Sequence, residues 1–437
     1  MTLSTAATQE IDQWLLSHFK PNEPGISAIV VQDGKTLYRA GYGAANVELD
    51  VPIRPEMVFR IGSITKQFTA AAILMLMERG KLALTDRLTK FLPRYPTQGH
   101  KITLAHLLTH TSGIKSYTDM PESVKISRED RTLAEMMDFF KDQPMDFAPG
   151  ERWQYCNSGY LLLGAVIEKV SGLSYEAFLQ KNIFDKLGMA DTHYDMPNKM
   201  IRGRVAGYSN GAAGIENSMY ISMTQPHAAG ALVSSVDDLA KWDAALYGSK
   251  LLKQSTLKQA WTSHILKNDK DTLYGYGWNI LRSDDLTLVE HGGGIPGFST
   301  FALRVPQHKL FVAVLANTNN PALEPIYVAW QLALRTMGQP HGEPNSFAIS
   351  KKDLAKLVGK YKVNELFDIA FRQKKNTLFV EFGAGSPLVE ICAMGQHEFF
   401  VKDSFLRFRF VAGDDSNVTA VKIFDRGVLR DTALRSA

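Results

Sequence analysis

The sequence predicts an α+β fold, with an antiparallel sheet flanked by helices, a helical subdomain beside it, and a small antiparallel β-barrel at the C-terminal end. Strand patterns occur early and return from residue 274 onward, while helical patterns fill most of residues 82–200 between them. Beyond residue 350, apolar and polar residues alternate as in half-buried antiparallel strands. A chain of 437 residues can bury a large core without disulfides.

The first part of the chain combines a helix, a hairpin and an apolar helix. The patterns predict a helix at residues 8–18, strands at 27–31 and 37–43, and a helix at 64–78. Asp33-Gly34 between the two strands is a dipeptide that favours a hairpin turn. Gly62-Ser63 precedes the second helix and Gly80 follows it, as expected at helix boundaries.

Helices dominate the middle of the chain, and strands return after it. Thr103 and Ser235 are expected to cap helices that begin directly after them, because their side-chain oxygens can accept free backbone N–H groups. Further helices are predicted at 133–141, 159–170, 175–182 and 325–337. Strands are predicted at 274–281, 286–290, 299–305 and 310–316, where they can complete the sheet begun by the first hairpin.

The end of the chain is predicted to be a separate β-domain. A helix is expected near 352–358, and alternating patterns predict strands at 367–371, 377–382, 398–401, 406–411 and 420–424. A segment with Pro and Gly separates this part from the rest. The predicted organisation is a domain at 1–338 with the helical subdomain at about 82–200, a linker at 339–349, and the barrel at 350–437.

The composition excludes several functional classes. The 49 Lys and Arg residues nearly balance the 45 Asp and Glu residues, and they are scattered, so we expect no nucleic-acid partner. No apolar stretch approaches the length of a membrane span. The first residues lack the basic and apolar regions of a signal peptide. We therefore expect no membrane span and no signal peptide in this chain, which leaves a cytoplasmic and a periplasmic or secreted location open.

The cysteines and histidines predict neither a disulfide framework nor a metal site. Cys156 and Cys392 are too few for such a framework or for a Cys-rich zinc site, and we expect free thiols. His106 and His110 are four residues apart, but no third ligand accompanies them. The chain also lacks the Gly-x-Ser-x-Gly, His-Glu-x-x-His and phosphate-binding Gly-Lys-Ser/Thr motifs.

The most informative pattern is Ser-x-x-Lys. A Ser and a Lys three residues apart on a helix share a face, and a desolvated Lys amine can accept the Ser proton. The pattern occurs four times, starting at Ser17, Ser63, Ser112 and Ser255. Only Ser63 follows a Gly at the start of an apolar helix, where free N–H groups can bind an oxyanion. Ser63 and Lys66 are therefore the candidate nucleophile and general base.

Two further segments carry candidate site residues. Tyr155 and Asn157 precede a predicted helix, and a Tyr beside a catalytic Lys can relay protons. Asn157 can hydrogen-bond either the Lys or the amide of a substrate. His291 starts the run His291-Gly292-Gly293-Gly294, placed where a strand is predicted to end after Glu290. Such a run lets a ligand approach the backbone closely, and an N–H there can complete an oxyanion hole.

In this order, Ser63-x-x-Lys66, Tyr155-x-Asn157 and His291-x-Gly293 resemble the motif set of the penicillin-binding-protein and class C β-lactamase superfamily of serine hydrolases. The resemblance extends over about residues 8–338. It implies that Ser63 is the nucleophile, Lys66 the general base and Tyr155 the proton shuttle.

The same resemblance implies binding roles and a cofactor-free reaction. Asn157, His291 and Gly293 are expected to bind substrate, and the N–H groups of Ser63 and Gly294 to form the oxyanion hole. No metal or organic cofactor is expected. Tyr117, Tyr220 and Phe298 are aromatic candidates for the wall of the acyl pocket, although each fits a place in the core or at the rim equally well.

The third motif departs from that of true class C β-lactamases, which carry Lys-Thr-Gly where this chain has His291-Gly292-Gly293. An imidazole that is largely neutral at pH 7 replaces the ammonium that grips the β-lactam carboxylate. The His-x-Gly form is similar to that of D-aminopeptidases and family VIII carboxylesterases. Several of those peptidases also carry lipocalin-like C-terminal barrels, which residues 350–437 resemble.

These observations predict a serine hydrolase that forms an acyl-enzyme at Ser63 and acts on small esters, amides or short peptides, D-amino-acid peptides among them, with weak or no β-lactamase activity. Two alternatives stay open. One is a penicillin-binding or β-lactam-hydrolysing protein of the DD-peptidase or class C type, and the other is a catalytically inactive binding module. The expected partner is a small-molecule substrate, and the sequence leaves the oligomeric state, the stereospecificity and the role of the barrel open.

Overall fold

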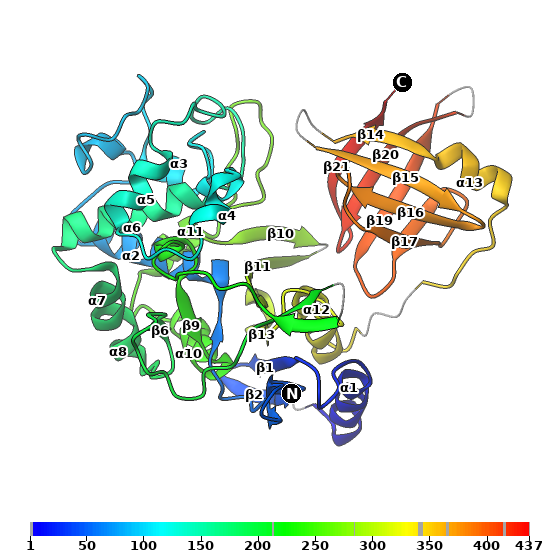
Figure 1. The fold of residues 1–437 in the computed structure, drawn as a ribbon, viewed down its shortest axis with the longest axis horizontal. Coiled ribbons are helices and arrows are strands. Elements are labelled where there is room, and N and C mark those ends of the chain that lie inside the picture. Colours follow the sequence, from blue (N-terminus) through cyan, green and yellow to red (C-terminus); the bar gives the residue numbers. More distant parts are fainter. Residues whose placement is uncertain are drawn as a thin grey trace. The chain divides into compact units, whose positions relative to one another are not determined.

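The chain folds into two units (Figure 1). The structure, a computed structural model, describes residues 3–211, 214–283, 285–339, 344–363, 367–413 and 417–436. Its contacts group Met1–Leu281 with Thr287–Thr336, and Arg282–Leu286 with Met337–Ala437. Residues 340–343 of the predicted linker lie outside the described residues.

A six-stranded sheet forms the centre of the first unit, in the order β10-β11-β12-β13-β1-β2. Its strands are β1 (Ile26–Gln32), β2 (Lys35–Tyr42), β10 (Asn279–Ser283), β11 (Leu286–Ile295), β12 (Phe298–Val305) and β13 (Leu310–Ala316). The described pairings from β11 to β2 are antiparallel, with Ala28 opposite Val314. Strands from both ends of this unit's sequence therefore complete one sheet, as predicted.

Helices cover this sheet. α12 (Pro325–Thr336) packs on β12, β13 and β1, and α10 (Val236–Ala245) packs on β13 and β1. Every residue of β13 is buried. A continuous apolar sequence such as that of β13 is typical of a strand that is covered on both faces.

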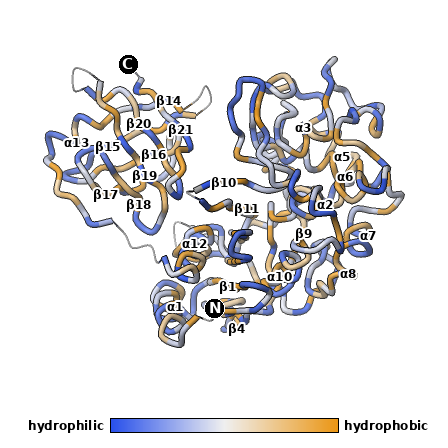
Figure 2. Tube along the Cα trace, turned by 180° about the vertical axis from the view of Figure 1, so that it is seen from behind, coloured by the Kyte–Doolittle hydropathy of each residue, from blue (hydrophilic) through white to orange (hydrophobic). Residues whose placement is uncertain are grey.

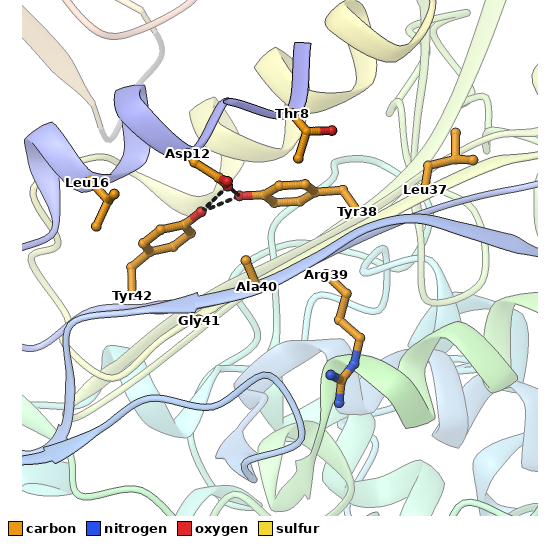
Figure 3. Close-up of a pocket in the computed structure, with 9 residues that line it drawn as sticks. All are labelled: Thr8, Asp12, Leu16, Leu37, Tyr38, Arg39, Ala40, Gly41 and Tyr42. Atoms are coloured by element: carbon orange, nitrogen blue, oxygen red, sulfur yellow. Dashed lines mark hydrogen bonds between the residues drawn. The ribbon is translucent and has the colours of Figure 1, made fainter. Parts of the chain in front are cut away.

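α1 (Thr5–His18) is attached to the edge strand β2 by the hydrogen bonds drawn in Figure 3. The hydroxyls of Tyr38 and Tyr42 donate to Asp12 Oδ1 at 2.8 and 2.6 Å. Burial raises the pKa of both phenols, so both remain protonated donors. Arg39 points to the other side of β2 and pairs with Asp237. The residues drawn in Figure 3 line a hollow of about 380 Å³. Its lining comes from α1 and β2, so we interpret the hollow as part of the contact between this helix and this strand.

The helical part is built around α2 and α6, which pack against each other and against α9. Its helices are α2 (Thr65–Glu78), α3 (Leu104–Leu108), α4 (Glu122–Ile126), α5 (Leu133–Phe140), α6 (Asn157–Ser171), α7 (Tyr175–Leu179), α8 (Asp185–Leu187), α9 (His227–Gly230) and α11 (Gln254–Ala260). Residues 65–76 of α2 are all buried. A helix that is apolar on all sides belongs in the core. The predicted caps are confirmed, because Thr103 and Ser235 accept backbone N–H groups at 3.3 and 3.2 Å.

Short strands connect this part to the sheet. They are β3 (Ala44–Asn46), β4 (Val51–Pro52), β5 (Phe59–Arg60), β6 (His193–Tyr194), β7 (Tyr208–Gly211), β8 (Gly214–Asn217) and β9 (Leu232–Ser234). β9 lies between β5 and β6 in a three-stranded sheet. Tyr208-Ser209-Asn210 is part of β7, which pairs with β8.

Two predicted strand boundaries were wrong. The strand predicted at 274–281 begins only at Asn279, because Gly277 adopts a left-handed φ of 86°. A Cβ at Gly277 would lie 2.7 Å from the carbonyl oxygen of Lys66, so this turn rests directly on α2. The strand predicted to end at Glu290 continues to Ile295, and His291 and the glycines after it pair with β12.

The second unit contains a closed antiparallel barrel of eight strands, so the predicted fold class is confirmed. They are β14 (Gly359–Lys362), β15 (Asp368–Lys374), β16 (Thr377–Phe382), β17 (Leu388–Ala393), β18 (Glu398–Val401), β19 (Leu406–Ala412), β20 (Val418–Asp425) and β21 (Val428–Arg435). Hydrophobic and hydrophilic residues alternate along some of these strands, such as β19 (Figure 2). α13 (Lys351–Leu357) adds Leu354 and Leu357 to the barrel core.

Aromatic side chains fill the barrel. Phe371 lies edge-to-face against Tyr361, Phe408 and Phe410, with ring centroids 5.4, 5.3 and 4.8 Å away. All four are buried. The barrel interior is therefore a packed core, as expected for a small barrel. None of the helices in the described ranges has the length and apolar character of a membrane span.

Candidate active site

Ser63 lies on a single 3-10 turn, Gly62–Ile64, between strand β5 and helix α2. Gly62 has a left-handed φ of 49°, and a Cβ there would lie 3.0 Å from the backbone nitrogen of Gly294. A glycine before the serine therefore lets this turn approach β11 closely. The same turn directs Ser63 into a cavity, which its side chain lines.

Lys66 is buried in the first turn of α2 and faces three oxygen atoms. Its Nζ lies 3.1 Å from Ser63 Oγ, 2.8 Å from Asn157 Oδ1 and 2.8 Å from the carbonyl oxygen of Ala229. Burial holds the pKa of the Lys66 amine well below its usual value. A neutral amine with two N–H groups can donate to Asn157 and Ala229 and present its lone pair to Ser63.

Asn157 is the first residue of α6, and its side chain is fixed on both sides. Its Oδ1 accepts from Lys66, and its Nδ2 donates to Thr118 Oγ1 at 3.1 Å. Its backbone N–H donates to Ser116 Oγ at 3.1 Å. The structure thus brings Asn157 to Lys66 and to the cavity, which both Asn157 and Thr118 line.

Tyr155 lies beside Lys66, with Nζ 4.7 Å from the centre of the phenol ring. Burial raises the pKa of the phenol, and the neighbouring Ser63 hydroxyl partly opposes this shift. A resting phenolate is therefore disfavoured. Among the described residues, the Tyr155 hydroxyl has no hydrogen-bond partner within the protein. Its proton is free to move toward a group bound at Ser63.

His291 lies behind Tyr155, with ring centroids 6.2 Å apart. Its Nδ1 is 2.6 Å from the carbonyl oxygen of Gly292 and its Nε2 is 2.9 Å from the hydroxyl of Tyr274. The first contact requires a proton on Nδ1, so Nε2 accepts from Tyr274. Burial, assisted by the charge of Lys66, lowers the pKa of His291 to about 3. His291 is a neutral, internally bonded side chain and is not among the residues that line the cavity.

The glycines after His291 differ in their surroundings. A Cβ at Gly293 would lie 2.1 Å from the carbonyl oxygen of Ile61, so only glycine fits between β11 and the segment before Ser63. A Cβ at Gly294 would meet no atom within 4 Å. Gly294 lines the cavity together with Ser63. The turn containing Ser63 and the strand residue Gly294 therefore form adjoining parts of its wall.

The cavity in front of Ser63 has a volume of about 210 Å³. Its described lining includes Tyr117, Thr118 and residues of α4, together with Met219, Ile221 and residues of the segment 225–230. No side chain in the described lining carries a formal charge. Of the three aromatic candidates, Tyr117 lines the cavity, whereas Phe298 and Tyr220 are absent from the described lining.

Several site groups were missed by the sequence interpretation. The carbonyl of Ala229 is a backbone acceptor, which no side-chain motif identifies. His110 packs against Tyr155 with ring centroids 4.4 Å apart, and its Nδ1 accepts the N–H of Cys156 at 3.0 Å. The backbone at His110 has a positive φ of 58°.

Cys156 lies between Tyr155 and Asn157 in the sequence, but it is not among the described residues that line the cavity. It is buried, its Sγ accepts the N–H of Gly159, and burial raises the pKa of the thiol to about 12. Neither Cys156 nor Cys392 forms a disulfide, in agreement with the prediction. The described residues contain no group of three His, Cys, Asp or Glu side chains that could hold a metal ion.

Comparison with known proteins agrees with this arrangement. The family described as Beta-lactamase matches residues 11–336. Penicillin-binding protein 4* of Bacillus subtilis (strain 168) is 27% identical over 412 residues, covering 89% of this chain and 90% of that protein.

Two solved structures are also similar. The octameric penicillin-binding protein homologue from Pyrococcus abyssi has 26% identity and a TM-score of 0.69, covering 99% of this chain and 100% of that one. The D-amino acid amidase from Ochrobactrum anthropi SV3 has 25% identity and a TM-score of 0.66, covering 76% of this chain and 100% of that one. The chain belongs to the β-lactamase family of serine hydrolases.

Proposed function

We propose that this enzyme forms an acyl-enzyme at Ser63 and hydrolyses small esters, amides or short peptides, D-amino-acid derivatives among them. The observation that carries the proposal is the distance of 3.1 Å between Ser63 Oγ and the buried amine of Lys66. A desolvated lysine has a lowered pKa, so its neutral form can accept the serine proton.

The proposed acylation has two steps. Ser63 Oγ attacks the substrate carbonyl carbon while its proton moves to Lys66 Nζ, and the resulting oxyanion is held by the N–H groups of Ser63 and Gly294. The bond to the leaving group then breaks. The Tyr155 hydroxyl gives its proton to the departing nitrogen or oxygen and takes one from Lys66 in return. In deacylation, water attacks the carbonyl carbon of the ester on Ser63 while its proton moves to Lys66. The bond to Ser63 Oγ then breaks, Ser63 Oγ takes the proton back from Lys66, and the product acid leaves.

The substrate class is supported by His291. A cation at this position would pair with a carboxylate on a β-lactam, but burial lowers the pKa of His291 to about 3 and leaves it uncharged. Similarity to the D-amino acid amidase supports an amide substrate. We therefore propose weak or no β-lactam hydrolysis, and we assign Asn157 to orienting Lys66 and the substrate.

A second candidate is slow acylation by β-lactams without efficient turnover. It is supported by the similarity to penicillin-binding protein 4*, which spans 90% of that protein. Both candidates use Ser63, so they differ in deacylation. A stable covalent penicillin adduct without ester turnover would favour this second candidate over the first.

The test is a substrate panel with p-nitrophenyl acetate and butyrate, the p-nitroanilides of D- and L-alanine, and nitrocefin. Ser63→Ala should abolish turnover of every substrate that the wild-type enzyme hydrolyses. Ser255→Ala is the matched control, because Ser255 also starts a Ser-x-x-Lys pattern but lies exposed on α11. Retained turnover by Ser63→Ala would contradict the proposal.

A further inference from the structure

The part of the cavity wall formed by α4, the residues after it and the segment 219–226 is a fixed surface. Gln225 Nε2 donates to the carbonyl oxygen of Glu129 at 2.8 Å, and the backbone N–H of Ser222 donates to the carbonyl oxygen of Ser127 at 2.8 Å. The Ser222 hydroxyl also donates to Asp130 at 2.6 Å. These bonds join the segment after α4 to the segment 222–225, so both move as one wall.

This wall is apolar at its outer edge. Val124 and Met219 line the cavity and remain 63% and 45% exposed. Exposed apolar side chains that continue a cavity mark a surface for an apolar ligand. The polar groups deeper in the cavity, such as Ser127, Thr118 and Gln225, are uncharged. Lys125 is exposed beside Val124 in the sequence and is not among the lining residues.

We propose that Val124 and Met219 bind an apolar acyl side chain of the substrate and that the cavity rejects anionic acyl groups. The occupant is the acyl part of a molecule attached to Ser63, because Ser63 opens into the same cavity. A carboxylate placed there would lose water without gaining a charged partner, which is strongly unfavourable. This inference rests on the proposed acyl-enzyme and names its acyl group.

The test compares two p-nitrophenyl esters of similar length, the neutral valerate and the anionic hemisuccinate. The wild-type kcat/KM should be at least about tenfold lower for the hemisuccinate. Val124→Lys and Met219→Lys should raise the preference for the hemisuccinate by about tenfold, whereas Leu49→Lys, a control at another exposed apolar residue, should not. Equal kcat/KM for the two esters in the wild-type enzyme would overturn the inference and leave the acyl-enzyme proposal intact. An active Ser63→Ala variant would instead overturn the acyl-enzyme proposal.

A separate observation concerns the third hydrogen bond of Lys66. The accepting carbonyl belongs to Ala229 in α9, a helix of four residues. α9 begins at His227, which has a positive φ of 39° although it is not a glycine. Non-glycine residues adopt such a conformation rarely, and only where the surroundings enforce it.

The side chain of His227 is enclosed by α6 and α7. A Cβ at Gly164 would lie 2.7 Å from His227 Nδ1, so the imidazole rests directly on that glycine. His227 Nε2 is 3.7 Å from Glu168 Oε1, and the rings of Tyr175 and Tyr194 lie 5.0 and 5.8 Å away. These are the titratable groups that contact the imidazole.

The backbone after His227 is held from the side of α2. Thr69 Oγ1 lies 2.6 Å from the carbonyl oxygen of Ala228 and 2.6 Å from the hydroxyl of Tyr175. One turn earlier on α2, Lys66 holds the next carbonyl, that of Ala229. We infer that His227 is a positioning residue, which fixes α9. In this position the Ala229 carbonyl accepts one N–H of the Lys66 amine, and the lone pair of the Lys66 nitrogen stays directed at Ser63.

The test is His227→Gly, which keeps the left-handed backbone accessible and removes the imidazole. Because Lys66 takes part in proton transfer, the rate constant of the acylation burst should fall about tenfold, while the substrate concentration that half-saturates this burst rate stays within about twofold. Gly164→Ala should also slow acylation without a change in half-saturation, since its Cβ would displace His227. Gly159→Ala on the same helix is the control, because its Cβ would make only an ordinary contact at 3.5 Å.

Active sites are counted by the size of the acylation burst, which separates slower chemistry from loss of folded enzyme. An unchanged acylation rate constant for His227→Gly, or a change confined to the half-saturating substrate concentration, would overturn the positioning role. Neither result bears on the acyl-enzyme proposal, which depends on Ser63→Ala.

Discussion

At the scale of single residues, the site depends on two basic side chains that burial keeps in their neutral forms. Lys66 and His291 are basic side chains, and both are buried. Burial lowers the pKa of each, which favours the neutral form. The consequences differ because Lys66 faces Ser63, whereas His291 is bonded to Tyr274 and Gly292. Lys66 can therefore exchange a proton with a substrate-bound group, and His291 supports the structure around it.

We predict that the rate of Ser63 acylation rises with pH through an ionisation well below 10.5, the ordinary value for lysine. The general base is the neutral amine, and the lowered pKa of Lys66 makes that form available at lower pH. Lys66→Arg should reduce the acylation rate by about 100- to 10,000-fold, since a guanidinium stays protonated. Stopped-flow acylation between pH 5 and 10 checks both points. A rise centred near 10.5 would contradict the assignment of Lys66 as a buried base.

His291 predicts a pH dependence of stability. The unfolded state takes up a proton near pH 6.5, whereas the folded state stays neutral down to about 3. The free energy of unfolding should therefore fall as the pH drops from 6.5 toward 3, by up to about 1.4 kcal/mol per pH unit from this group. His291→Gln should lack this contribution. Urea unfolding of both proteins at several pH values measures the difference, and parallel pH slopes would contradict the buried neutral state.

The side-chain part of the site could be predicted from the sequence, and the backbone part could not. Ser63, Lys66, Tyr155 and Asn157 lie together as their spacing and the resemblance implied. The carbonyl of Ala229 carries no signal in its own residue type, because every residue has a carbonyl. Its place follows from the packing of α9 between α2 and α6, which depends on residues distant in the sequence.

At the scale of elements, strand β11 shows how tertiary contacts override a local pattern. The sequence predicts that the strand ends at Glu290, so that the glycines after His291 lie beyond it. They lie inside β11 and pair with β12. A glycine is required at position 293 because the carbonyl oxygen of Ile61 occupies the space that a side chain would need. Ile61 lies more than two hundred residues earlier in the sequence, so a local pattern cannot reveal this contact.

Gly293→Ala and Gly294→Ala should therefore behave differently. The added methyl group at position 293 meets backbone atoms that cannot move aside, and we expect a loss of about 1–3 kcal/mol in the free energy of unfolding. At position 294 the methyl group meets open space, so stability should change by less than about 0.5 kcal/mol while the acylation rate falls. Thermal unfolding combined with burst kinetics tests the pair, and equal stability losses would be inconsistent with the packing at Gly293.

At the scale of the whole molecule, the two units each have a hydrophobic core of their own. The order of the predicted segments, with helices between two sets of strands and a β-domain last, could be taken from periodicity. The closure of the barrel could not be predicted from periodicity, because hydrophobic and polar residues do not clearly alternate in β14, β17 and β21. In β21 only Ala433 is buried, so its sequence resembles that of a polar loop.

A separate barrel core predicts separate unfolding. Phe371→Ala should destabilise the barrel by about 3–5 kcal/mol, because its ring contacts three other buried aromatic rings. The acylation rate at Ser63 should stay unchanged at temperatures where the barrel is still folded. Differential scanning calorimetry should then show one transition moved to lower temperature and one unmoved. A single transition that shifts as a whole would contradict independent cores.

The central claim is that Ser63, activated by Lys66, carries the acyl group. Peptide mass spectrometry after rapid quenching of the reaction with p-nitrophenyl butyrate tests it most directly. We predict a butyryl group on the peptide that contains Ser63 in the wild-type enzyme, in amounts that match the burst of p-nitrophenol. The group should be absent in Ser63→Ala and strongly reduced in Lys66→Arg. A butyryl group on another residue, or a burst of the same size in Ser63→Ala, would contradict the account.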